Sequence, residues 1–146
     1  MVSVRRTAVG SESQRGSVLM LMPAAVLIVV ILGAIAIDSA VVFGAQRELV
    51  NGAQAAANDA ATYGIDEGAF RQGRGYVYDP ARVEEAVARA LASREITANY
   101  RWFRDGARIV VELDEDVGYV FAKAVPGAAD GTTVRARAAA TLRDVP

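Results

Sequence analysis

Residues 18–37 read VLMLMPAAVLIVVILGAIAI, a run of twenty side chains without a charge. At about 1.5 Å per residue, a helix of this length spans roughly 30 Å, the thickness of the hydrocarbon core of a bilayer. Twelve of the twenty residues are Val, Leu or Ile, and each favours membrane insertion by about 0.3–0.6 kcal/mol. We therefore expect one membrane-spanning helix here. The side chains expected to anchor it in lipid are Val18, Leu19, Leu21, Leu27, Ile28, Ile31, Leu32, Ile35 and Ile37.

The charges beside this run predict its orientation. Arg5, Arg6 and Arg15 precede it, whereas the fifteen residues after it hold two acidic side chains and one arginine. Under the positive-inside rule, residues 1–17 are cytoplasmic and everything after the run lies on the outer side of the cell membrane. The sequence thus predicts a single-pass protein of the inner, cytoplasmic membrane with an extracytoplasmic C-terminal part.

A cleaved secretory signal is the alternative interpretation of the same run. The triplet Ala34-Ile35-Ala36 resembles the small-residue site at which such signals are cut. Cleavage near Ala36 would release a small secreted binding protein. The run is longer than the roughly 7–15 residues of a typical signal, and this length favours a retained anchor.

The composition narrows the function. The 146 residues leave room for one modest domain after the apolar run. The 16 basic and 17 acidic side chains give a net charge of -1, so no basic field points to nucleic acid. The chain has no Cys and no His, which removes disulfides, the usual zinc sites and His-assisted catalysis. We expect neither an enzyme nor a cofactor.

The helix is expected to continue beyond the apolar run, because residues 38–64 are rich in Ala and no proline lies between Asp38 and Pro80. Small and apolar side chains recur three and four positions apart, which indicates one stripe along a helix. The members of this stripe are Val42, Ala45, Leu49, Ala53, Ala56 and Ala60. With Gly64 as a C-cap, the helix would run from about Val18 to Tyr63, roughly 69 Å at 1.5 Å per residue.

Small residues along this helix are candidates for close packing between helices. They are Gly33, Ala36, Ala40, Gly44, Ala53, Ala56 and Ala60. One interpretation is that neighbouring rods of the same kind pack on this face. The other is that the C-terminal domain folds back and covers the face itself, with Val83, Val87 and Leu91 lying against it.

Residues 65–146 are expected to form a small α+β domain. Asp79 and Pro80 are typical of a helix N-terminus, and the helix they open is expected to end near Ser93. Asp105-Gly106 is a hairpin turn between two alternating segments. The fold class is therefore α+β, a long pilin-like transmembrane helix followed by one helix packed on a three-stranded antiparallel sheet. The strands are expected over residues 96–103, 108–114 and 134–142.

Asp114, Glu115 and Asp116 form an acidic cluster after the second predicted strand. Carboxylate oxygens are the ligands that calcium prefers, so a cation site is one interpretation. The ligand number and the glycine of a known calcium loop are missing, so a solvated turn is the other. No metal is expected on the strength of this cluster.

The surroundings of two further features stay open at this point. Asp38, directly after the apolar run, either pairs with a basic group of a neighbouring subunit or simply marks the membrane boundary. Residues 118–125, GYVFAKAV, are apolar around Lys123. They either touch the headgroup layer or a partner subunit, or form a third core segment of the domain.

Three short motifs follow one another in a characteristic order along the first part of the chain. Arg15 and Gly16 precede the apolar run, Asp38 closes it, and an R-x-L-x-N-x-A stretch then opens an Ala-rich helix. In this order they resemble the TadE/TadG-like proteins of the tight-adherence (Flp, type IVc) pilus assembly system, over about the first 64 residues. The positions that carry the R-x-L-x-N-x-A stretch are Arg47, Leu49, Asn51 and Ala53.

The resemblance implies a non-catalytic, membrane-anchored minor pilin or pseudopilin-like subunit. Its partners would be the lipid bilayer, other pilin-like or Tad assembly subunits, and further copies of the same chain. Prepilin-like members of the system are cut after a Gly and carry Glu at the fifth mature position. A cut after Gly16 would place Leu21 there, so this sequence does not indicate that processing. Its length favours a short TadE-like subunit over the longer TadG type.

Overall fold

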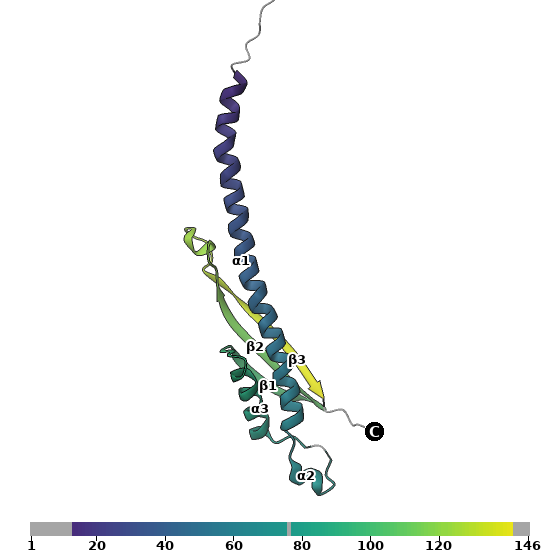
Figure 1. Ribbon diagram of the computed structural model, residues 1–146. Helices are drawn as coiled ribbons and strands as arrows, with labels where there is room; N and C mark the ends of the chain where they lie inside the picture. The colour runs from purple at the N-terminus through teal and green to yellow at the C-terminus, as the bar shows by residue number, and fades with distance from the viewer. Residues whose placement is uncertain (1–12, 76, 142–146) are drawn as a thin grey trace, which may run out of the picture.

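The computed structural model describes residues 13–75 and 77–141 (Figure 1). A very long helix leads into a small sheet and two shorter helices, and its N-terminal half stands apart from everything else. The elements in chain order are α1 (Ser13–Tyr63), α2 (Glu67–Arg71), α3 (Pro80–Ala92), β1 (Asn99–Asp105), β2 (Arg108–Gly118), the 3-10 turn η1 (Ala122–Ala124) and β3 (Gly131–Thr141).

Helix α1 is one unbroken element of 51 residues that passes through Pro23, roughly 77 Å long at about 1.5 Å per residue. The predicted continuation to Tyr63 is confirmed. The apolar side chains of its first half are exposed, for example Leu21 at 63% and Leu32 at 61%. This half is long and apolar enough to cross a membrane, which fits a single-pass membrane protein. Arg5 and Arg6, and the side chains of Arg15, Val18 and Leu19, lie outside the described part of the structure.

The sheet has three antiparallel strands in the order β1-β2-β3. Asp105 pairs with Arg108 across the predicted turn, where Gly106 has a φ of 61° that favours glycine. The strand boundaries differ from the expected ones. β1 begins three residues later, at Asn99, and β2 continues to Gly118, where it pairs with Gly131 at the start of β3.

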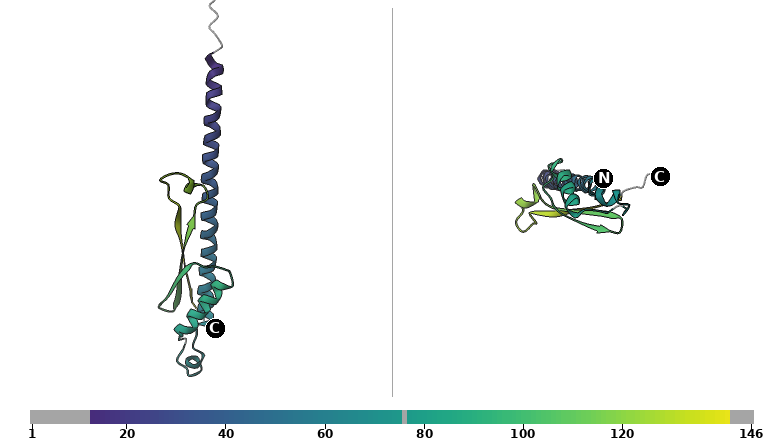
Figure 2. Two further views of the ribbon diagram at one scale, coloured as in Figure 1. Left: turned by 90° about the vertical axis from the view of Figure 1, so that its left-hand side faces the viewer. Right: turned by 90° about the horizontal axis from the view of Figure 1, so that it is seen from below.

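The core lies between the second half of α1 and one face of the sheet. Leu49 of α1 and Ile109, Val111 and Leu113 of β2 are at most 1% exposed, and they belong to one buried cluster. Helices α1 and α3 lie on the same side of the sheet, and α1 runs along the sheet (Figure 2). The prediction that α3 would be the helix on the sheet was therefore incomplete, because α1 covers the sheet and α3 packs chiefly along α1. The folded unit consequently includes the second half of α1 and is not confined to residues 65–146.

The three alanines of the predicted packing face that lie in the second half of α1 are covered by the domain of this same chain. Ala53, Ala56 and Ala60 are all fully buried. Val83, Val87 and Leu91 of α3 belong to the same cluster, so the domain does fold back onto this face. The expectation that neighbouring rods pack on Ala53, Ala56 and Ala60 was wrong, since no surface is left there.

Gly64 ends α1 for a different reason from the expected one. Its N–H donates to the carbonyl of Ala60 at 3.0 Å, but its backbone is not in the left-handed region. A Cβ at this position would collide with the Ala60 carbonyl oxygen and with a methyl group of Val83. Glycine is needed here because α3 passes so close to the end of α1.

Candidate functional site: the junction at Asp38

Asp38 lies on α1 directly after the apolar run, and its side chain turns toward the domain. It is 7% exposed and is the only polar or charged residue in the described chain that is classed as buried. Its Oδ1 accepts the main-chain N–H groups of Val120 at 2.6 Å and Phe121 at 3.0 Å. Its Oδ2 accepts the N–H of Ala122 at 2.8 Å. One carboxylate therefore holds three consecutive amides of the connection between β2 and β3.

The Asp38 carboxylate and the three amides satisfy each other's need for hydrogen-bond partners. A buried carboxylate is costly unless hydrogen bonds replace its water, and N–H groups at the start of a helical turn have no partner within the turn. Each bond to a charged group typically contributes about 1.5–3 kcal/mol. The two oxygens of Asp38 satisfy the amides that enter η1, and those amides in turn make the burial of Asp38 tolerable. Of the two interpretations of Asp38, pairing with a neighbouring subunit is not favoured, since both oxygens are engaged within the chain.

A second bond joins α1 to the sheet two turns further along. Gln46 Nε2 donates to the main-chain carbonyl of Arg135 on the edge strand β3 at 2.7 Å. Val42 and Ala45, between the two contacts, are partly buried against the core. Asp38 and Gln46 together fix which face of α1 is turned toward the sheet.

The β2–β3 connection presents apolar side chains to the outside. Val120 is 45% exposed, Phe121 44% and Val125 58%. The interpretation of residues 118–125 as a third core segment is therefore wrong, because the core of β2 ends at Val117. Between the connection and α1 lies an open depression of about 510 Å³. Its walls are formed by Ile35, Asp38, Ser39, Val42, Phe43, Gln46, Tyr119 and Ala122.

The acidic cluster does not converge on a common point. Asp114, Glu115 and Asp116 all lie within β2, so successive side chains point to opposite faces of the sheet. Asp114 accepts a bond from the Asn99 side chain and Asp116 one from Thr133 Oγ1. Within the described residues, no group of three or more His, Cys, Asp or Glu side chains is placed to hold a metal ion. Residues 114–116 therefore form part of a regular strand, and neither the predicted solvated turn nor the predicted cation site is present there.

The family-like R-x-L-x-N-x-A stretch divides between two faces of α1. Leu49 and Ala53, four residues apart, are fully buried against the sheet. Arg47 and Asn51, also four apart, are exposed on the other side. Packing of the domain accounts for the first pair, whereas the second pair has no such structural role.

A junction between α3 and β1 was not foreseen from the sequence. The Glu84 carboxylate accepts the hydroxyl of Tyr100 at 2.6 Å and the indole N–H of Trp102. These two bonds lower the pKa of Glu84, against a small opposing effect of burial. The bond to Glu84 in turn raises the pKa of Tyr100, with burial adding to it. The available signal was the alternation of Tyr100 and Trp102 on one face of the predicted strand.

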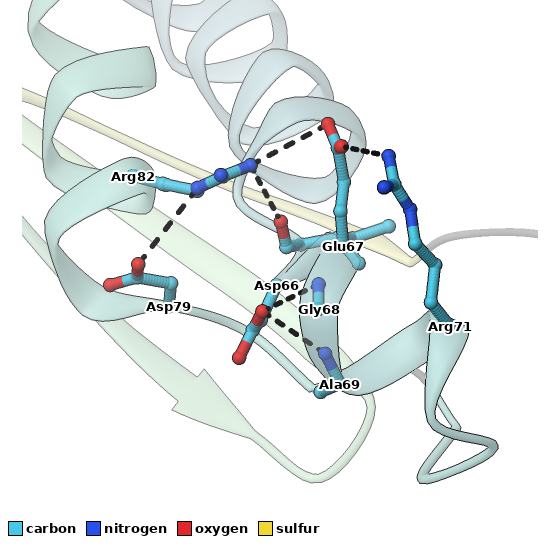
Figure 3. Close-up of polar contacts among 8 residues, drawn as sticks. Asp66, Glu67, Gly68, Ala69, Arg71, Asp79 and Arg82 are labelled. Atoms are coloured by element: carbon cyan, nitrogen blue, oxygen red, sulfur yellow. Dashed lines mark hydrogen bonds and ion pairs between the residues drawn. The ribbon is translucent and has the colours of Figure 1, made fainter.

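The opposite end of the domain is organised by exposed charges (Figure 3). Asp66 caps α2 by accepting the N–H groups of Gly68 and Ala69. Arg82 of α3 reaches the carboxylates of Glu67 and Asp79 at 3.6 and 3.9 Å. Because these side chains are 41–67% exposed, the ion pairs contribute little to stability. They lie between α2 and the first turn of α3.

Comparison with protein families, curated proteins and solved structures finds no match to this chain.

Proposed function

We propose that this chain is a membrane-anchored, non-catalytic structural subunit of a tight-adherence (Flp) pilus or a related secretion apparatus. One observation carries the proposal: the exposed apolar half of α1 continues without a break into a half that is buried under a three-stranded antiparallel sheet. This layout supports the proposal, because a pilin likewise has a long N-terminal helix that mediates contacts between subunits. In the proposed orientation the sheet lies on the outer side of the cell membrane. The lack of Cys and His supports a structural role over a catalytic one.

The free face of α1 supports lateral assembly. Successive helix residues differ by about 100° around the axis, so Gly33, Ala36, Ala40 and Gly44 fall on the side away from Asp38 and Leu49. All four small residues are exposed, and a Cβ at Gly33 or Gly44 would meet no atom within 4 Å. Such a row lets a second helix approach closely.

The same face changes character further along. Arg47, Asn51 and Gln54 continue it as exposed polar side chains. We therefore confine the proposed helix contact to residues 33–44, at and just beyond the end of the apolar run. This contact is shorter than the one expected from the whole stripe of small residues.

Single-cysteine crosslinking in native membranes tests the proposal, because the chain has no Cys to give background. Cysteine at Ala36, Ala40 or Gly44 should crosslink efficiently to a pilin-like subunit or to a second copy. Val41, which is 38% exposed on the flank, and the buried Ala56 are the matched controls and should react poorly. Mass spectrometry of the product identifies the partner. Uniform or absent crosslinking would exclude packing through this face, and a partner unrelated to pili or secretion would exclude the proposed system.

A further inference from the structure

We propose that the β2–β3 connection, residues 119–130, rests in the headgroup layer of the membrane that α1 crosses, with Val120, Phe121 and Val125 in contact with lipid. The domain would then be docked on the bilayer surface and not merely tethered above it. This inference rests on the membrane-anchoring part of the proposed function. It does not depend on which apparatus the chain belongs to.

The first argument is the level of the connection along α1. Asp38 follows the apolar run directly, and the amides of Val120, Phe121 and Ala122 lie within 3.0 Å of its carboxylate oxygens. A bilayer of about 30 Å hydrocarbon thickness measures about 40–45 Å with its interfacial regions, which leaves a layer roughly 5–7 Å deep on each side. A segment held this close to the end of the span lies within that layer. Figure 1 and the left view of Figure 2 show the connection at the end of the sheet nearest the apolar half of α1.

The second argument is the character of the exposed side chains at this level. Phe121 and Val125 of the connection are 44% and 58% exposed, and Phe43 on the facing part of α1 is 69% exposed. Phe43 and the connection border the same depression. After Asp38, the next charge on α1 is that of Arg47. A loop that met only water would be expected to carry polar side chains here, whereas apolar and aromatic ones suit the membrane interface.

The third argument is charge, and it favours lipid over a second copy as the occupant. Of the two charges in residues 119–130, Asp130 lies directly before β3, and the exposed Lys123 lies between Phe121 and Val125 in the sequence. Its aliphatic stem can lie along the apolar layer while its ammonium reaches the phosphate groups of the lipids. Cations next to a membrane surface are attracted by anionic lipids.

Fluorescence quenching on the full chain tests the inference. The protein is reconstituted at low density in vesicles of phosphatidylcholine and phosphatidylglycerol, with one cysteine carrying an environment-sensitive dye. Phe121→Cys and Val125→Cys report on the connection, Leu27→Cys on the span, and Gln72→Cys, just after α2, on the far end of the domain. We expect acrylamide to quench the dye at positions 121 and 125 severalfold less than at 72. Lipids brominated near the headgroup should quench it at 121 and 125 but not at 72.

The controls separate this inference from the proposed function. Acrylamide quenching at 121 as strong as at 72, with position 27 still protected, would overturn the docking and leave the anchor intact. Strong quenching at position 27 as well would overturn the membrane span itself. Protection at 121 that appears only as the protein-to-lipid ratio rises, without quenching by brominated lipid, would assign the surface to a second copy and overturn the lipid contact.

Discussion

The carboxylate of Asp38 accepts the main-chain N–H of Phe121 across a separation of 83 residues. This contact connects the end of the apolar run to the tip of the sheet, so it sets where the domain sits along the helix. The neighbouring bonds to Val120 and Ala122 make it a three-point attachment.

Replacing Asp38 should weaken the fold through this attachment. Asp38→Ala leaves three amides without their acceptor, and we expect it to lower the free energy of unfolding by about 2–3 kcal/mol. Asp38→Asn keeps one acceptor oxygen, so its free energy of unfolding should fall between those of the wild type and Asp38→Ala. The measurement is urea unfolding of the full chain in detergent. Ser39→Ala is the matched control, because Ser39 Oγ bonds only to the Ile35 carbonyl on the exposed side of α1; equal losses in both variants would contradict the role of Asp38.

Truncation of Leu49 tests whether the second half of α1 belongs to the domain core. Leu49 is fully buried, whereas the adjacent Val50 is 48% exposed. Leu49→Ala should lower the free energy of unfolding by about 2–5 kcal/mol, as for other large-to-small changes in cores. Val50→Ala should stay within about 0.5 kcal/mol of wild type. Similar small effects for both would show that the sheet folds independently of the helix.

Acid should weaken the junction between α3 and β1. The pKa of Glu84 is lowered by its bonds to Tyr100 and Trp102, so the folded state keeps this carboxylate ionised more strongly than the unfolded state does. The resulting stabilisation is complete above the ordinary glutamate pKa of 4.5 and is lost as the pH falls through the lower, folded-state pKa. Glu84→Gln should cost about 1 kcal/mol at neutral pH, a value reduced for the exposure of the pair.

The readout for Glu84 is the free energy of unfolding measured from neutral to acidic pH. The Glu84→Gln variant should lose less stability on acidification than the wild type does. Glu85→Gln is the control, because Glu85 pairs only with Arg89 on the surface, where both side chains are more than 60% exposed. An unchanged pH profile in Glu84→Gln would contradict the assignment.

Fractionation and a topology reporter test the anchor and its orientation. The protein should stay with the membrane in high salt and in carbonate and should be extracted only by detergent, because burial of apolar side chains retains it. Recovery in the soluble fraction with a new N-terminus near Ile37 would instead support the secreted alternative.

The orientation is tested with a topology reporter fused after Pro146. A reporter that works only outside the cytoplasm should be active there. A silent reporter would reverse the predicted orientation.

Sequence patterns predicted the elements of this fold better than their contacts. The apolar run and the turn at Gly106 depend on local properties, namely length and a φ that glycine tolerates. The helix end at Tyr63 was also placed correctly, although Gly64 is required there by the close approach of α3. Ala53, Ala56 and Ala60 show what such patterns leave undecided. A stripe of small side chains fits a neighbouring helix and a sheet of the same chain equally well, and only the tertiary structure distinguishes the two.

The Asp38 junction could not be found in the sequence for a different reason. Its partners are main-chain amides, which every residue except proline carries, so Val120, Phe121 and Ala122 have no distinguishing signature. The acidic cluster at residues 114–116 was misinterpreted because the strand is longer than its apolar part. Once β2 continues to Gly118, strand alternation places Glu115 on the opposite face of the sheet from Asp114 and Asp116.

The unbroken course of α1 has a mechanical consequence. The helix contains no hinge between its apolar half and Tyr63, and Asp38 and Gln46 tie it to the sheet at two levels. The described chain therefore has no flexible joint between the apolar half of α1 and the domain. Rotation of the apolar half about the helix axis must turn the sheet by the same angle. Tension applied near α2 would likewise be transmitted along the helix axis to the apolar half of α1.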